Sequence, residues 1–270
     1  MQLQSLPSTP RRRDPVRIQR AVLFALVVRD LRSRVQGRWL SLTWMVFEPL
    51  AHVMTILTVV GVRRGLVSTT VELPVFLITG MLPFFLFRNL ARRLPAAISS
   101  NRSLFAYRQV KPIDALAARA IVEISLYSVV YLIALFMLGW VGYHAVPHAP
   151  LELIVVSAVL LLLGTGLGLL FAVLTHQRPR VNTVVGLVFY PLYFASGVIF
   201  PLHNLSTNVL SWLLYNPILH LVELSRLYFI PNYVAVSGVS LAYPAAWALV
   251  VAALAMSLYR VYRFRFTTVG

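Results

Sequence analysis

The chain has 270 residues and is 59% hydrophobic, with a mean hydropathy of +0.78. These values exclude an ordinary soluble domain and indicate a polytopic membrane protein. The net charge is +16, and the 24 basic residues cluster at a few places along the chain. Such clusters are typical of the signals that orient a membrane protein towards anionic lipid, so we do not interpret the charge as evidence for a nucleic-acid partner. The absence of cysteine excludes a disulfide framework, a thiolate metal site and a cysteine nucleophile.

The N-terminal segment, residues 1–38, is polar and contains nine arginines. Its apolar run at 21–28 would reach about 12 Å as a helix, against about 30 Å of hydrocarbon, so it cannot span a membrane. Arginines and no small-residue cleavage site follow this run, which argues against a signal peptide. We expect a helix that lies at the cytoplasmic interface, with charges that are not confined to one face.

Six apolar stretches predict an all-α polytopic membrane protein with six transmembrane helices. They cover about 39–61, 74–87, 120–143, 151–174, 181–200 and 241–260, within a transmembrane domain at 39–260 that a short tail, 261–270, follows. The fourth stretch contains Gly164, Gly166 and Gly168, small residues that suit close helix–helix contact.

Glu48 and His52 are the candidates for a polar site inside the first span. They are four residues apart and therefore share a helical face. A charge in mid-bilayer costs about 2.5–3.5 kcal/mol on insertion scales, so such residues usually face a cavity or a partner. A packing pair satisfied by a neighbouring helix and a conduit-lining pair both remain open.

Residues 201–231 contain two apolar pieces, 208–215 and 218–230, that are bracketed by prolines. Each is too short or too charged to cross alone, so we expect a re-entrant helix pair before the last span. Glu223 and Arg226 are three residues apart, and we expect them to pair on one face and keep the second helix near the wet interface. Asn216 and His220 are expected to satisfy backbone groups freed at the turn.

The distribution of basic residues supports this layout. With six spans, 21 of the 24 basic residues fall on the side that holds both termini. Because positive charge marks the cytoplasmic side, both termini are predicted to be cytoplasmic.

Residues 95–119, called the basic segment here, form the one long polar interval in the middle of the chain. They contain its single lysine, Lys111. Such an interval cannot lie in hydrocarbon, so it is either a solvated loop or a docking element that receives force from a soluble partner. A phosphate-binding loop needs glycines followed by lysine, and Lys111 follows Val110. Any nucleotide energy must therefore come from another polypeptide.

Several stretches resemble the permease subunits of ABC-2 type polysaccharide exporters, and most of all their capsular polysaccharide branch. Val28–Arg34 followed by Trp44–Leu50 resembles the opening of these subunits, and Leu73–Gly80 resembles their second span. Tyr107–Asp114 is similar to the segment after that span, although Arg108 stands where proline is common. Asn216-Pro217 with His220, Glu223 and Arg226 is similar to a late family pattern.

The resemblance implies a homodimer that binds two ATP-binding cassette subunits and forms a conduit for a lipid-linked acidic glycan in the bacterial inner membrane. ATP and Mg²⁺ would be bound by those partners, so no cofactor is expected in this chain. A periplasmic co-polymerase and an outer-membrane exporter are implied as further partners. The basic segment is the coupling element in that family, and its candidate residues are Asn101, Arg102, Tyr107, Arg108, Gln109, Lys111 and Asp114. The conduit candidates are Trp44, Glu48, His52, Arg88 and Arg92.

Three alternatives remain open. The same machinery could export O-antigen or teichoic acid. A membrane-embedded enzyme acting on polyprenyl or lipid substrates would need a cluster of acids or histidines on a cytoplasmic loop, whereas the basic segment offers only Asp114. A proton-driven carrier would need more ionisable residues in mid-span than Glu48 and His52.

Overall fold

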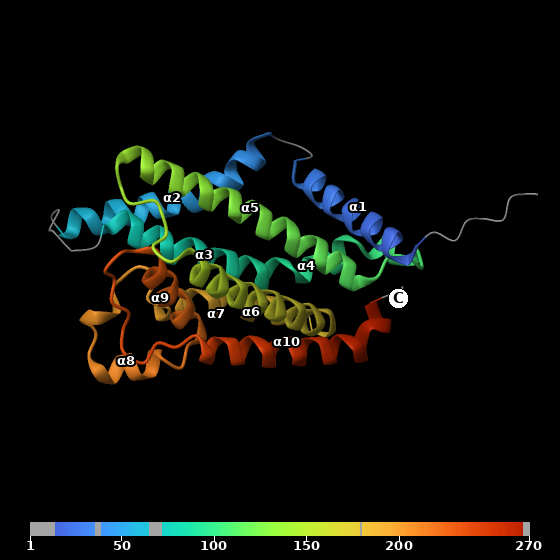
Figure 1. Cartoon of the computed structure of the whole chain (residues 1–270). Coiled ribbons are helices and arrows are strands. Elements are labelled where there is room, and N and C mark those ends of the chain that lie inside the picture. Colours follow the sequence, from blue (N-terminus) through green and yellow to red (C-terminus); the bar gives the residue numbers. More distant parts are fainter. Residues whose placement is uncertain (1–13, 36–38, 65–71, 179, 267–270) are drawn as a thin grey trace, which may run out of the picture.

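A computed structural model describes the backbone of residues 14–35, 39–64, 72–178 and 180–266, and Figure 1 shows these residues as a bundle of helices. Throughout these ranges the regular structure is helical. The helices are α1 (Pro15–Val35), α2 (Trp39–Arg64), α3 (Leu73–Arg93), α4 (Pro95–Ser100), η1 (Arg102–Ala106), α5 (Pro112–Val141), α6 (Pro150–Gln177), α7 (Val181–Ala195), η2 (Leu202–Asn204), α8 (Thr207–Leu213), α9 (Pro217–Phe229), α10 (Ala242–Tyr262) and η3 (Arg263–Phe266).

Four of these helices, α3, α5, α6 and α10, are long and apolar enough to cross a membrane. The first and fifth predicted spans coincide with shorter apolar helices, 47–59 inside α2 and α7 itself. The 15 residues of α7 reach about 22 Å, which is less than the hydrocarbon thickness. The all-helical membrane fold is therefore confirmed with four candidate spans.

The third helix, α3, is the centre of the bundle. It packs against α2, α5, α6, α7 and α9, and Figure 1 shows it between α5 and α6. Its side chains Leu77, Met81, Phe84 and Leu90 are fully buried. A helix that is apolar on nearly all sides is stable only when other helices surround it, and α3 has that environment.

The glycines of α6 give it close contact with two neighbours, as predicted. A Cβ atom on Gly168 would lie 2.6 Å from the carbonyl oxygen of Leu90 on α3. A Cβ atom on Gly166 would lie 3.3 Å from the backbone nitrogen of Ala252 on α10. Alternate glycines thus let α6 approach the backbones of α3 and α10 on different sides.

Helix α1 is longer than its apolar run and lies along the start of α5 (Figure 1). Leu26 and Asp30 are buried, and Arg34 is nearly so. These positions are four residues apart and form one face. The charged side chains of α1 are therefore not confined to one face of the helix, as expected, because some of them lie on the face that packs on α5.

Helices α8 and α9 lie close to the two apolar pieces predicted before the last span. The proline that was expected to separate them, Pro217, is the first residue of α9. At that position proline leaves no helical donor unpaired. The preceding residue, Asn216, caps α9, because its Oδ1 accepts the N–H of Ile218 at 3.0 Å.

We expect Gly168→Ala to destabilise the protein, since the added methyl group would collide with the Leu90 carbonyl oxygen at a backbone position. Overpacking of this kind costs about 1–3 kcal/mol. Gly139→Ala on α5 is the matched control, because its Cβ atom would meet only Ala145 Cβ at 3.5 Å. Thermal unfolding of the two purified variants in detergent should show a lower midpoint for Gly168→Ala alone. Equal midpoints would contradict the close packing of α6.

Candidate functional site

The basic segment is a folded platform. It consists of α4, η1 and the beginning of α5. Ala97, Ile98 and Phe105 are buried in an apolar cluster that also includes residues of α6 and α10. The backbone N–H of Ile113 donates to the Tyr259 hydroxyl of α10 at 3.2 Å. The segment is therefore anchored to the helices beneath it.

Five of the seven predicted coupling residues lie on the outer surface of this platform. The exposed residues are Arg102, Tyr107, Arg108, Gln109 and Lys111. Tyr107 is 66% exposed, which is unusual for a large aromatic side chain without a partner surface. The exposed set combines an aromatic ring with cations, so its chemistry suits a partner that presents an acidic and apolar surface.

The other two predicted coupling residues hold the segment in shape. Asn101 Nδ2 donates to the carbonyl of Ala97 at 2.8 Å and closes the end of α4. Asp114 is buried, and its Oδ2 accepts the backbone N–H of Lys111 at 2.9 Å, at the start of α5. Its Oδ1 accepts from Gln19 Nε2 of α1 at 2.5 Å. The structure thus separates this set into outward-facing and structural residues.

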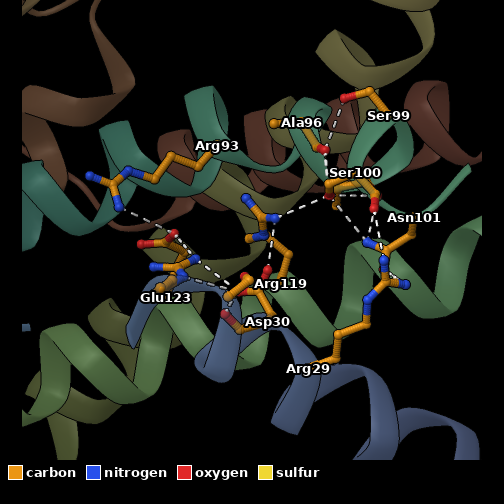
Figure 2. Close-up of polar contacts among 12 residues, drawn as sticks. Arg29, Asp30, Arg93, Ala96, Ser99, Ser100, Asn101, Arg119 and Glu123 are labelled. Carbon is orange, nitrogen blue, oxygen red and sulfur yellow. Dashed lines mark hydrogen bonds and ion pairs between the residues drawn. The ribbon is translucent and has the colours of Figure 1, made fainter. Parts of the chain in front are cut away.

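Helix α1 contacts the basic segment and the start of α5 through further hydrogen bonds and an ion pair (Figure 2). Arg29 donates to Asn101 Oδ1 at 3.1 Å and to the Ser100 carbonyl at 3.3 Å. Arg119 of α5 pairs with Asp30 at 2.7 Å and donates to Ser100 Oγ at 3.3 Å. The position of α4 is therefore linked to the position of α1.

Glu123 is the centre of this polar cluster and is completely buried. Arg34 of α1 approaches Glu123 Oε1 at 2.6 Å. Arg93 of α3 approaches the same oxygen at 3.7 Å, and Figure 2 shows Arg93 beside Glu123. Arg34 also pairs with Asp30 at 3.0 Å. One carboxylate on α5 thus binds cations from two other helices. We call Asp30, Arg34, Arg93, Arg119 and Glu123 the ion cluster.

The two acids of the ion cluster, Asp30 and Glu123, were not among the residues predicted to form a site. Glu123 falls inside the third predicted span, and an acid in such a position generally pairs or serves a function. That signal could have identified Glu123. Its cation Arg34 lies 89 residues away, and no local periodicity indicates such a partner.

The described conduit candidates gather around α2, α3 and α7. His52 Nε2 lies 3.3 Å from the Tyr193 hydroxyl, and its ring meets Phe85 edge-on with centroids 5.2 Å apart. The Arg88 guanidinium lies over the same Phe85 ring at 4.7 Å, a cation–π contact. His52 is exposed and still contacts aromatic rings, with the cation beside it, so packing and conduit-lining roles both stay predictions.

The remaining conduit candidates differ in their surroundings. Glu48 is exposed one turn before His52. Arg92 is exposed and approaches α7 near Gly186. The side chain of Trp44 lies outside the described residues. An exposed acid and an exposed base thus flank the aromatic contacts of His52 and Arg88.

At the opposite end of the bundle, Asn216 and His220 satisfy backbone groups, as predicted. Asn216 caps α9, and its Nδ2 donates to the Ala195 carbonyl at 3.3 Å and to Ser196 Oγ at 2.9 Å. His220 Nδ1 accepts the Ser240 N–H at 3.0 Å, and its Nε2 lies 2.9 Å from the Leu214 carbonyl. These hydrogen bonds join the turn between α8 and α9 to the residues at the end of α7 and to the segment that follows α9.

The predicted pair of Glu223 and Arg226 forms at 2.9 Å, but it is buried inside the protein and does not face water. Both residues are 0% exposed. Arg226 donates to the carbonyls of Gly197 at 2.9 Å and Val198 at 2.7 Å. Gly80 leaves the space that the guanidinium occupies. Burial is possible because carbonyl oxygens replace the water that the cation loses.

Tyr233 completes this buried pair, with its hydroxyl 3.0 Å from Glu223 Oε2. Burial and the neighbouring Glu223 carboxylate raise the pKa of Tyr233 well above its ordinary value. The phenol therefore stays protonated and donates to the carboxylate throughout the neutral range.

Comparison with known proteins gives a consistent set of relatives. A family model described as ABC-2 type transporter matches residues 21–230. The chain is 36% identical over 248 residues to the polysialic acid transport protein KpsM of Escherichia coli, which covers 92% of this chain and 96% of that protein. It is 26% identical over 213 residues to the capsule polysaccharide export inner-membrane protein CtrC of Neisseria meningitidis serogroup B, with 79% and 80% covered. It is 25% identical over 195 residues to the O-antigen export system permease protein RfbA of Myxococcus xanthus, with 69% and 70% covered.

We expect Glu123→Gln to loosen α1, because Arg34 and Arg93 lose a buried counter-charge. Breaking a buried pair costs about 3–5 kcal/mol, and we expect the lower end because Asp30 still pairs with Arg34. Limited trypsin digestion should cleave the arginine-rich α1 faster. Glu152→Gln, in the exposed first turn of α6, is the control. Unchanged cleavage in Glu123→Gln would show that the ion cluster does not hold α1.

Proposed function

The chain belongs to the ABC-2 type transporter family, and on this premise we propose that it is the membrane-spanning permease of an ATP-driven exporter of capsular polysaccharide. The observation that carries this proposal is the near full-length similarity to KpsM, a polysialic acid transport protein. The similarity to CtrC, a capsule polysaccharide export protein, points to the same class of substrate. Inner-membrane location follows from the same relatives and from the apolar helices.

ATP hydrolysis is assigned to a separate subunit. The chain has one lysine, and no phosphate-binding loop can be built around it. Two ATP-binding cassette subunits would dock on a homodimer of this chain and bind ATP and Mg²⁺ themselves. The exposed residues Tyr107, Arg108, Gln109 and Lys111 support this role for the basic segment. The anchoring of the segment to α1, α5 and α10 would let it transmit force to the bundle.

The conduit is assigned to the surface of α2, α3 and α7. Arg88 and Arg92 supply positive charge there, which suits a lipid-linked acidic glycan, and Glu48, His52 and Trp44 complete the candidate set. Large apolar side chains of α2 and α7 are exposed beside them and would face lipid or the second copy of the proposed homodimer. These exposed side chains are Phe47, Met54, Val184, Leu187, Val188 and Phe194.

The proposed topology has six spans, with both termini in the cytoplasm and α8 and α9 re-entrant from the periplasm. The end of the bundle that holds the basic segment would then face the cytoplasm, in agreement with its positive charge. Helices α8 and α9 have 7 and 13 residues, or about 10 and 20 Å, which is too short to cross. A periplasmic co-polymerase and an outer-membrane exporter would receive the glycan.

Export of O-antigen is the second candidate function. It is favoured by the similarity to RfbA, an O-antigen export permease. That similarity is lower and covers less of the chain than the similarity to KpsM, so we place capsular polysaccharide first.

We expect the double variant Arg108→Glu, Lys111→Glu to lose most of its partner ATPase on co-purification and most of its surface capsule. Both side chains are exposed on the platform, so reversing them changes the charge of the docking surface without disturbing the core. The measurements are the ATPase retained by the tagged permease and the capsular glycan at the cell surface.

The matched control is Arg178→Glu, Arg180→Glu, which reverses the same number of exposed charges in the turn between α6 and α7. It should retain the ATPase. If the basic-segment variant also retains the ATPase and exports normally, docking does not occur at this surface.

We expect single cysteines at Asn204 and Val234 to react with an impermeant maleimide from the periplasm, and one at Gln109 to react only after permeabilisation. All three positions are exposed, and the chain has no native cysteine. Val234 is preferable to Asn232, whose φ of 60° disfavours most side chains. Reaction of Asn204 and Val234 from opposite sides would mean that residues 204–234 cross the membrane, and the six-span topology would be wrong.

A further inference from the structure

A pocket of about 300 Å³ lies between α3, α5 and α6 and reaches Ser225 of α9. This volume is at the lower end of the range of about 300–1,000 Å³ for ligand pockets. All three long helices are candidate membrane spans, so the pocket lies at the depth of lipid chains. Leu132 on its rim is 65% exposed, so the pocket meets the surface of the bundle. Its α3 wall is formed by Leu82, Pro83 and Leu86.

Three of the five hydroxyl-bearing residues that line the pocket, Tyr127, Ser157 and Ser225, already have hydrogen-bond partners in the protein. Asn89 Nδ2 donates to the Tyr127 hydroxyl at 2.6 Å. Ser157 donates to the carbonyl of Leu153 at 2.8 Å, within its own helix. Ser225 donates to the carbonyls of Thr79 at 2.9 Å and Val222 at 2.7 Å. Because these hydroxyls have partners, the pocket presents a mainly apolar surface and suits an apolar occupant.

A cation lies about two helical turns beyond the pocket along α3, because Arg93 follows the lining residue Leu86 by seven residues. Arg93 follows Asn89 by four residues on α3, and Glu123 precedes Tyr127 by four on α5, so the contact between Arg93 and Glu123 continues the same row. Arg93 is 39% exposed and lies 3.7 Å from Glu123, whereas Arg34 holds the same oxygen at 2.6 Å. Glu123 is therefore neutralised mainly by Arg34, and the guanidinium of Arg93 is available to an anion.

We propose that this pocket binds one acyl chain of an anionic bilayer phospholipid, with the phosphate of its headgroup at Arg93. The arrangement suits such a lipid. Arg93 lies at the end of the bundle that carries the other basic residues, and the apolar pocket lies further from that end, between the long helices. The pocket uses a different face of α3 from Arg88 and Arg92, as residues at 100° per position require. We therefore assign the pocket to a lipid of the membrane and not to the anchor of the exported glycan. The distinction between these two occupants rests on the proposed conduit at Arg88 and Arg92.

The test is non-denaturing mass spectrometry of the full-length protein in detergent, titrated with phosphatidylglycerol or with zwitterionic phosphatidylcholine. The wild-type protein should retain one phosphatidylglycerol in preference to phosphatidylcholine. Ser128→Trp fills the pocket and should lower phosphatidylglycerol retention at least tenfold. Arg93→Gln should abolish the preference between the two lipids. Val129→Trp, at the next position and 50% exposed, and Arg178→Gln, which changes an exposed cation just after α6, are matched controls that should behave as the wild type.

Thermal unfolding gives a second measurement, because a ligand that binds only the folded state raises the midpoint. Phosphatidylglycerol should raise the midpoint of the wild type and of Val129→Trp, but not that of Ser128→Trp. Equal retention in all variants would overturn the proposal. Loss in Arg93→Gln alone would show a surface headgroup contact without a chain in the pocket, and would overturn it too. Co-purification of a glycan-bearing lipid that is lost in Ser128→Trp would assign the pocket to the substrate instead.

Discussion

The buried carboxylate of Glu123 is the constraint on which the basic end of the bundle depends. Arginines from α1 and α3 reach this one group on α5. Removing charges from water costs several kcal/mol per ion unless each has a partner. Asp30 and Glu123 provide these partners, and without them α1 would bring its cations into a region that is already positive. The ion cluster thus allows α1 to pack on α5, and the burial of Leu26 adds to the stability of this packing.

The ion cluster also relates the two candidate regions of the molecule. Arg93, in the last turn of α3, belongs to the cluster, and Arg92 beside it faces α7 and the conduit candidates. The basic segment begins directly after this turn. A movement of the platform would therefore act on α1 and α3 together. Figure 2 shows contacts from all of these elements within one small region.

Local patterns in the sequence predicted much of this architecture. The apolar stretches located the helices, Pro217 located the break between α8 and α9, and the alternate glycines located the close contacts of α6. Such features depend on neighbouring residues, so periodicity and turn chemistry reveal them. The spacing of Glu223 and Arg226 predicted their pairing but not their burial, because burial depends on Gly80 and on the carbonyls near Gly197. The basic segment likewise contains exposed residues and structural residues, and the structural ones are those that α1 contacts. No local pattern in the sequence predicts where α1 packs.

The buried Arg226 also has a consequence for movement. Its guanidinium joins α9 to the carbonyls of Gly197 and Val198 and lies over Phe76 at 3.6 Å. Separating these parts would remove the carbonyl partners of a buried cation and leave it with Glu223 alone, so we expect α9 and the 197–198 turn to move as one body with the beginning of α3. The connection between α9 and α10 belongs to the same body, because Tyr233 bonds to Glu223 and Ser240 bonds to His220. Asn232 and Gly238 have left-handed backbone in this connection, with φ of 60° and 94°, and most side chains disfavour that conformation.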